Sequence, residues 1–254
     1  TIGNIYQKEK FISRDTQILD DNSQNDFYLS GFNNTTTFMF NDFFLGLHYK
    51  FRKGIFTLKQ GVYLHNYNWK VEQKNLITSN KWVPLPDFLL KIEFNNSKKI
   101  QLNYNLKSNF SEASKLANRF YLKSYNSVFK GNETLENELS HSARIRYSRF
   151  SLYRGLMFTA NANYNKKLDG FRNAVVFDGI NQFLTIQMLE NPNENWGLST
   201  SIRKRIKKIR YKFSGNYNNS KYLQGIDNNF VVNKNESYVF NVGAETLFED
   251  FKKK

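Results

Sequence analysis

The sequence predicts an all-β protein whose antiparallel strands form part of a transmembrane β-barrel. Three observations support this fold class: apolar and polar residues alternate with a period of two, the alternating runs are long, and short basic turns separate them from long polar loops. A tilted strand that crosses a bilayer needs about 9–11 residues, whereas strands of soluble proteins usually have about 5–6. Most of the runs have roughly the longer length.

The composition agrees with this fold class. Aromatic residues make up 17% of the 254 residues, and 24 of them are Phe, although the mean hydropathy is only −0.63. Half of each barrel strand can be polar, so a low mean hydropathy does not argue against a membrane barrel. No stretch reaches the 18 consecutive apolar residues that suggest a transmembrane helix. The absence of cysteine excludes disulfides and thiolate metal sites.

Residues 155–165, with the sequence GLMFTANANYN, show the alternation most clearly. Leu156, Phe158 and Ala160 point to one face of the expected strand, and Asn161 and Asn163 point to the other. The apolar face of such a strand can pack against the core of a soluble sandwich or against lipid.

About nine strands of this kind are expected. Each has one apolar face, and they cover residues 38–51, 55–67, 83–94, 99–107, 140–148, 155–166, 195–205, 209–220 and 236–248. The short turns between them are basic and lie at 52–54, 95–98, 149–154 and 206–208. The long polar loops are expected at 68–82, 108–139, 167–194 and 221–235. Short turns on one side and long loops on the other are typical of outer-membrane barrels, with the loops outside the cell and the turns in the periplasm.

The polar faces of these strands are expected to line a hydrated lumen, where they could contact a ligand. The lumen-facing ligand candidates are Lys50, Asn103, Asn105, Asn161, Asn163, Arg203, Arg210 and Lys212. The four basic members of this set favour an anionic ligand, as a hypothesis from charge alone.

One segment resembles a known family. Residues 131–147, GNETLENELSHSARIRY, resemble the GNPxLxPE stretch and following strand in the barrels of TonB-dependent receptors of Bacteroidetes-type bacteria, with Glu133 and Asn137 where that motif has proline. The order and spacing of residues 49–61, 66–73, 122–128 and 193–220 are also similar to that family. The resemblance covers residues 30 to 250, approximately.

The resemblance implies a barrel of 22 strands with a plug in its lumen, located in the bacterial outer membrane. Such a receptor imports a scarce nutrient with energy delivered through TonB. The implied partners are the TonB complex, outer-membrane lipid, a small ligand of unknown identity and, in some cases, a surface lipoprotein. We expect residues 1–254 to be an internal piece of this single barrel domain, because Thr1 follows no visible signal peptide and the chain stops directly after a strand-like run. The plug, the TonB-contacting segment and the remaining strands are then missing from this sequence.

Two other interpretations stay open at this point. The chain could be a secreted soluble β-rich module for binding or adhesion, or a passive porin that has no plug. No nucleophile motif, phosphate loop or HExxH motif is present, so we expect no enzymatic activity and no cofactor. His48, His65 and His141 fall in different strands without ligand spacing, and this argues against a metal site.

Two charged segments have simple structural interpretations. The carboxylates of residues 133–138 are expected to be solvated, and not a catalytic pair for glycoside hydrolysis. The run RKRIKKIR at 203–210 is expected to be a hairpin and not a nucleic-acid site, although the net charge is +15. Basic residues recur at every short turn and do not form one patch.

Overall fold

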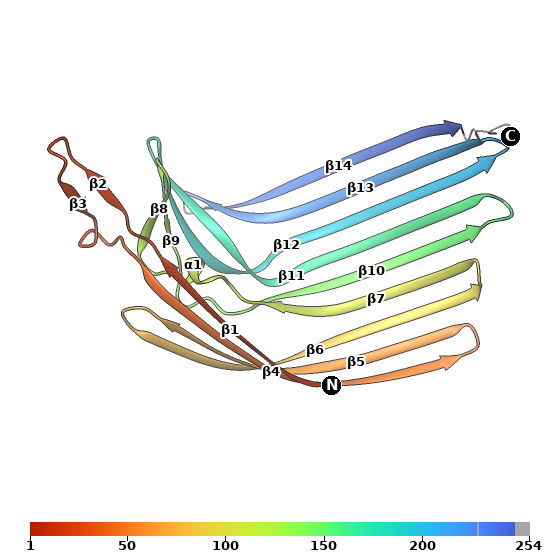
Figure 1. The fold of residues 1–254 in the computed structure, drawn as a ribbon, viewed down its shortest axis with the longest axis horizontal. Helices are drawn as coiled ribbons and strands as arrows, with labels where there is room; N and C mark the ends of the chain where they lie inside the picture. Colours follow the sequence, from red (N-terminus) through yellow and green to blue (C-terminus); the bar gives the residue numbers. More distant parts are fainter. Residues whose placement is uncertain (228, 247–254) are drawn as a thin grey trace, which may run out of the picture.

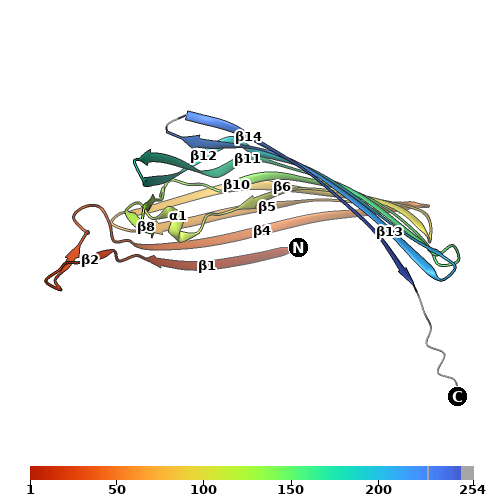
Figure 2. The same ribbon diagram turned by 90° about the horizontal axis from the view of Figure 1, so that it is seen from above.

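The chain forms one broad, twisted sheet in the computed structural model, which describes residues 1–227 and 229–246 (Figures 1 and 2). Strand accounts for 79% of the structure and helix for 2%, which confirms the all-β class. The ten long strands are β1 (Ile2–Ile12), β4 (Thr35–Lys53), β5 (Phe56–Glu72), β6 (Leu76–Asn95), β7 (Lys98–Asn109), β10 (Glu138–Ser151), β11 (Leu156–Asp178), β12 (Asn181–Ile206), β13 (Ile209–Ile226) and β14 (Asn229–Thr246). The short elements are β2 (Thr16–Ile18), β3 (Gln24–Asp26), α1 (Ala113–Leu116), β8 (Phe120–Ser124) and β9 (Ser127–Lys130). None of the described helical residues forms a segment long and apolar enough to cross a membrane.

The long strands form an antiparallel meander. From β4 to β14, each long strand pairs with the long strand before it, and β1 adds to the free edge of β4. Tight turns with positive φ at Gly54 and Lys207 close two of the hairpins at the end of the sheet that carries the basic turns. Among the described residues, no pairing joins β1 to β14, so the sheet is open.

All nine expected strands are present, but most are longer than predicted. Three of the four expected long loops, at 68–82, 167–194 and 221–235, are mostly strand, so the loop-length pattern was wrong for them. Only residues 108–139 remain largely a connection, and they carry α1, β8 and β9. The long strand β1 and the short strands β2 and β3 were also missed. Residues 247–248 of the last expected strand lie outside the described residues.

The strand ends were missed because the apolar residues change faces within a strand. On β5, Val62 and Leu64 lie on one face, whereas Tyr67, Trp69 and Val71 lie on the other. The ladder continues through the change because it joins main-chain groups, which do not depend on side-chain polarity. A search for one continuous apolar face therefore ends too early.

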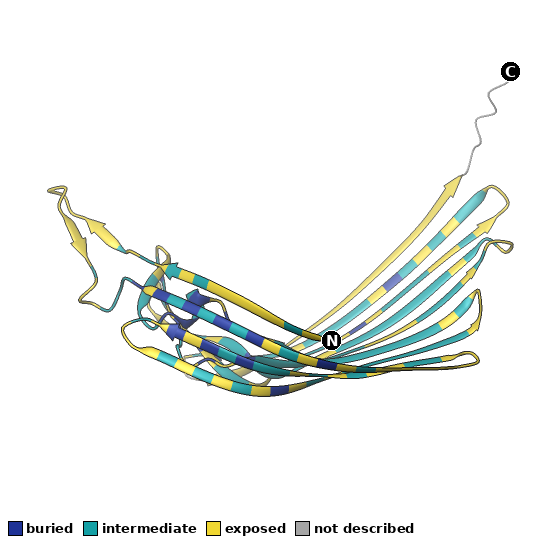
Figure 3. Cartoon of the chain, turned by 60° about the horizontal axis from the view of Figure 1, so that its bottom comes forward, coloured by how far each residue is buried: buried dark blue, intermediate teal, exposed yellow. Residues whose placement is uncertain are grey.

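The core lies on one face of the sheet, which we call the inner face, at the end away from the basic turns. Here β4 and β5 contribute Phe38, Phe40 and Trp69, and the connection contributes Leu116 of α1 and Phe129 of β9. Figure 3 shows the alternation of buried and exposed residues along β4 and β5 at this end. Burial raises the pKa of the Tyr67 hydroxyl in the same cluster, as expected for a dry core. We call the opposite face the outer face.

A glycine lets two side chains meet across an intervening strand on the inner face. His48 of β4, Gly61 of β5 and Asp87 of β6 lie in one row of the ladder. His48 Nε2 lies 3.1 Å from Asp87 Oδ1, directly over Gly61. A Cβ atom at Gly61 would lie 2.3 Å from His48 Cδ2 and 2.6 Å from Asp87 Oδ1. The close approach therefore requires glycine at this position.

We predict that Gly61→Ala destabilises the protein by about 1–3 kcal/mol, because the added methyl group separates His48 from Asp87 and strains the row. Gly243→Ala is the matched control, since a Cβ atom there meets no atom within 4 Å, and its effect should stay within about 1 kcal/mol. Denaturant unfolding of both variants measures the difference. Equal stabilities would contradict this account of the row.

Candidate functional site

The outer face carries a continuous band of apolar side chains, which we call the outer belt. It consists of the outer-face residues within 43–51, 56–64, 82–94, 100–106, 143–147, 156–164, 196–202, 211–217 and 238–244, which are apolar except at Gln60 and Thr200. Leu47 is 77% exposed and Val242 is 82% exposed. Among the described residues, no element packs over this face.

The edge of the outer belt is tilted with respect to the ladder. At the end away from the basic turns, the last apolar outer-face residue is Phe43 on β4 and Trp196 on β12. The next outer-face residues beyond them are polar, Asn41 on β4 and Glu194 on β12. If the paired residues are followed from strand to strand across the sheet, the row that starts at Trp196 on β12 arrives at Tyr49 on β4. From Phe43 to Tyr49 is six residues, and β4 and β12 are separated by six strand-to-strand steps.

A shift of one residue per strand fixes the geometry of the belt. With a rise of about 3.3 Å per residue and a strand spacing of about 4.8 Å, the strands tilt by about 35° from the normal of the belt edge. The eight residue steps from Phe43 to Phe51, along strands tilted in this way, make the belt about 22 Å tall at β4.

The inner face is mostly polar from β7 to β13 over the length of the outer belt, whereas β4, β5 and β6 also place Phe44, Tyr63, Leu85 and Leu89 on it. The register places all eight predicted lumen-facing residues on this face. Asn103 and Asn163 flank Arg144 in one row, and Asn161 lies beside Arg146 in the next row. The two arginines were not among the predicted residues, although the alternation around Ala143 and Ile145 contained the signal for them.

The eight predicted residues do not form one pocket. Lys50 lies on β4, and Asn105 of β7 lies in the row of Asp87. Arg203 is paired in register with Lys212, at the end of the sheet with the basic turns. Glu245 of β14 forms ion pairs with Lys212 and with Arg210, the latter at 3.4 Å. Part of the positive charge at that end is therefore neutralised.

A different feature brings distant segments together at the other end of the sheet. From Asn181 to Glu190, β12 pairs with β11 on one side, and its residues 182–185 pair with β9 on the other side. From Asn193 onward, β12 lies between β11 and β13 and pairs with both. The change occurs at Asn191, whose φ is 48°, and at the fully buried Pro192. Beyond this point β11 pairs directly with β13, at Ala174↔Gly225 and Val175↔Ile226. We call this divergence of β12 from β13 the fork.

A cavity of about 440 Å³ lies at the fork. Five elements line it, namely α1, β10, β11, β12 and β13, through Lys115, Glu138, Lys167, Phe171, Arg172, Asn173, Ile186, Tyr222, Leu223 and Gln224. None of these residues was predicted as part of a site, because all of them fell in expected loops and the cavity depends on the fork.

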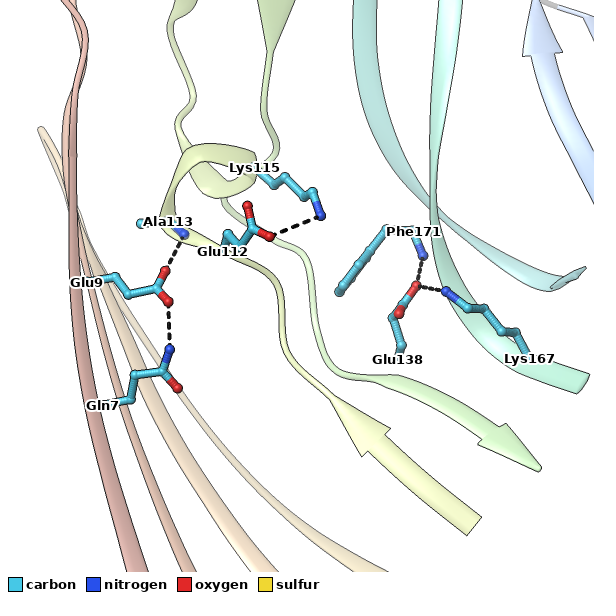
Figure 4. A network of polar contacts seen from close by, with 8 residues as sticks. All are labelled: Gln7, Glu9, Glu112, Ala113, Lys115, Glu138, Lys167 and Phe171. Atoms are coloured by element: carbon cyan, nitrogen blue, oxygen red, sulfur yellow. Dashed lines mark hydrogen bonds and ion pairs between the residues drawn. The ribbon is translucent and has the colours of Figure 1, made fainter. Parts of the chain in front are cut away.

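Glu138 fixes one wall of this cavity. Its Oε1 atom accepts a hydrogen bond from Lys167 Nζ at 2.7 Å and another from the Phe171 main-chain N–H at 2.8 Å (Figure 4). The side chain of Glu138 is only 13% exposed, so both contacts are largely shielded from water. This carboxylate joins the start of β10 to the segment of β11 that leads into the fork.

Neither comparison with known proteins identifies a relative of this chain. A scan against protein-family models finds no match, and a search of curated proteins finds no match either. In residues 1–227 and 229–246, no group of three or more His, Asp or Glu side chains is arranged to hold a metal ion.

We predict that Glu138→Gln lowers the free energy of unfolding by about 1–3 kcal/mol, because Lys167 then loses a shielded carboxylate partner. Glu136→Gln is the matched control. Glu136 pairs with Lys81 at 2.6 Å, but both side chains are well exposed, so its loss should cost about 0–1 kcal/mol. Denaturant unfolding compares the two variants, and limited proteolysis within 170–190 should be faster for Glu138→Gln alone. An equal loss in both variants would show that the Glu138 contacts do not hold the hairpin.

Proposed function

We propose that this chain is the barrel portion of an outer-membrane receptor that takes up a nutrient with energy from TonB. In this proposal the outer belt faces lipid and the inner face lines the lumen. The outer belt is the observation that supports it most strongly. Soluble monomers rarely expose a contiguous apolar patch larger than a few hundred square ångströms, and the outer belt runs across nine strands.

The geometry of the outer belt fits a bilayer. Membrane barrels have strands tilted by about 35–45° and an apolar band about 25 Å tall, flanked by aromatic girdles. The tilt derived for the outer belt lies at the lower end of this range, and its height of about 22 Å at β4 is close to that of such a band. Aromatic side chains lie toward one edge at Trp82, Tyr164 and Trp196, and toward the other edge at Phe51 and Tyr211. Strands β5 to β13 are paired on both sides over most of the height of the outer belt, as strands in hydrocarbon require, and in this proposal the open edges at β1 and β14 pair with the remaining strands of the barrel.

The inner face supports a hydrated lumen in the same proposal. Asn, Ser and Arg side chains, such as Asn103, Arg144, Asn161 and Ser199, face inward at the height of the outer belt. The dependence on TonB, the plug and the uptake of a nutrient come only from the family resemblance, which residues 131–147 carry most clearly. A lipoprotein partner has the same basis.

The orientation follows from how far the strands continue past the outer belt. β12 continues from Trp196 back to Asn181 at one end, whereas at the other end the turn after Ile206 follows closely. Outer-membrane barrels have short periplasmic turns and longer extracellular segments. We therefore place the fork and the core outside the cell and the basic turns in the periplasm.

We predict that Leu47→Arg destabilises the full-length protein in lipid vesicles by about 2–4 kcal/mol, the cost of a charge near the middle of the bilayer. Asn161→Arg is the control on the inner face and should cost much less. Equilibrium unfolding from vesicles measures both. If Leu47, which is 77% exposed, faced water as in a secreted soluble module, its replacement would change stability by no more than about 0.5 kcal/mol. That outcome would favour the soluble module over the membrane barrel.

Single cysteines test the same face assignment without a stability measurement. The sequence has no native cysteine, so each introduced thiol is unique. In the full-length protein in vesicles, a lipophilic thiol reagent should label positions 158, 160 and 162, and a water-soluble reagent should label positions 159, 161 and 163. Both sets lie in β11 and differ only in the face on which they lie. If positions 158, 160 and 162 do not react with the lipophilic reagent, the outer belt packs against protein and the proposed function fails.

A further inference from the structure

Arg172 lines the cavity at the fork without a partner that neutralises it. Its Nε atom is buried and has no hydrogen-bond partner, and none of the ion pairs of the described residues includes it. The guanidinium lies 5.4 Å from the centre of the Tyr222 ring, which fixes its position but accepts no conventional hydrogen bond. A buried donor without an acceptor costs free energy, so an acceptor in the cavity would stabilise this arrangement.

The charge of the cavity favours an anion as that acceptor. Glu138 neutralises Lys167 at 2.7 Å. Lys115 has only a distant carboxylate, Glu112 at 4.0 Å, and that carboxylate is 70% exposed. Arg172 and Lys115 therefore leave the cavity with two positive charges in excess. Asn173 and Gln224 add uncharged hydrogen-bonding groups to the lining.

We propose that the cavity at the fork binds an anionic group of a ligand, a carboxylate, phosphate or sulfate, between Arg172 and Lys115. The planar guanidinium can donate two parallel hydrogen bonds to two oxygens of such a group, while the ammonium of Lys115 contributes a point charge. The volume of about 440 Å³ accommodates a small acid or the charged end of a larger molecule.

The position of the cavity relates it to the proposed function. Tyr222 and Gln224 follow Tyr217 on β13, where the outer belt ends, so the cavity lies beyond the belt. That the anion belongs to the imported cargo rests on the proposed function, in which this end of the sheet faces the outside of the cell. That the cavity binds an anion rests only on its own residues.

The test measures the binding of inorganic phosphate and of acetate to the full-length protein in detergent by isothermal titration calorimetry. Chloride holds the ionic strength constant, so that screening does not differ between samples. Arg172→Gln should weaken binding of the bound probe at least tenfold, and Lys115→Gln should weaken it several-fold. Arg172→Lys keeps the charge but loses the planar fork, and should lie between Arg172→Gln and the wild type. Lys234→Gln, at an exposed position on β14, is the matched control and should bind as the wild type does.

Two results would overturn the proposal. One is the absence of binding of both probes to the wild type, and the other is equal binding by the wild type, Arg172→Gln and Lys115→Gln. Lys115 is 41% exposed on a surface helix, so Lys115→Gln remains informative if Arg172→Gln does not fold. The measurement in detergent does not depend on lipid or on TonB. A failed cysteine labelling with intact phosphate binding would therefore remove the proposed function and leave the anion site standing.

Discussion

The main-chain hydrogen bonds that pair the strands from β4 to β14 determine the two faces of the sheet, and the other features of the structure depend on these faces. Because each strand is paired along most of its length, the register decides which face each side chain occupies, and a slip of one residue would exchange the two faces. The outer belt, the polar inner face and the row of His48, Gly61 and Asp87 all follow from the same register. The tilt of the belt edge also follows from the register, because the paired residues of one row lie at different distances from the belt edge on successive strands.

The change of apolar face within a strand reflects two different environments along one element. At the height of the outer belt, β4 directs Leu45 and Leu47 outward, and beyond the belt it directs Phe38 and Phe40 inward. The inward residues are covered by the connection 108–139, whose Leu116 is 1% exposed. One end of the sheet is therefore built like a soluble protein, with a core on its inner face, and the other end has no core on either face among the described residues.

Local alternation predicted nine of the ten long strands and the face of each proposed lumen residue, because a period of two is a property of neighbouring residues. It did not predict the strand ends at 68–82, where the apolar face changes, or the fork, where Asn191 and Pro192 redirect β12. Arg172 lay in an expected loop for the same reason. The cavity joins residues more than a hundred positions apart, from Lys115 to Gln224, and no periodic pattern encodes such a contact.

The core and the cavity at the fork are coupled through α1. This helix has four residues, too few to be stable alone, so its position depends on tertiary contacts. Leu116 is held in the core, and the Ala113 main-chain N–H donates a 3.0 Å hydrogen bond to Glu9 of β1 (Figure 4). Lys115 lies between these two anchored residues, and its ammonium therefore reaches the cavity from a place set by β1 and the core. The ammonium of Lys115, which lines the same cavity as Arg172, is thus held in place by the contacts that α1 makes with β1 and with the core.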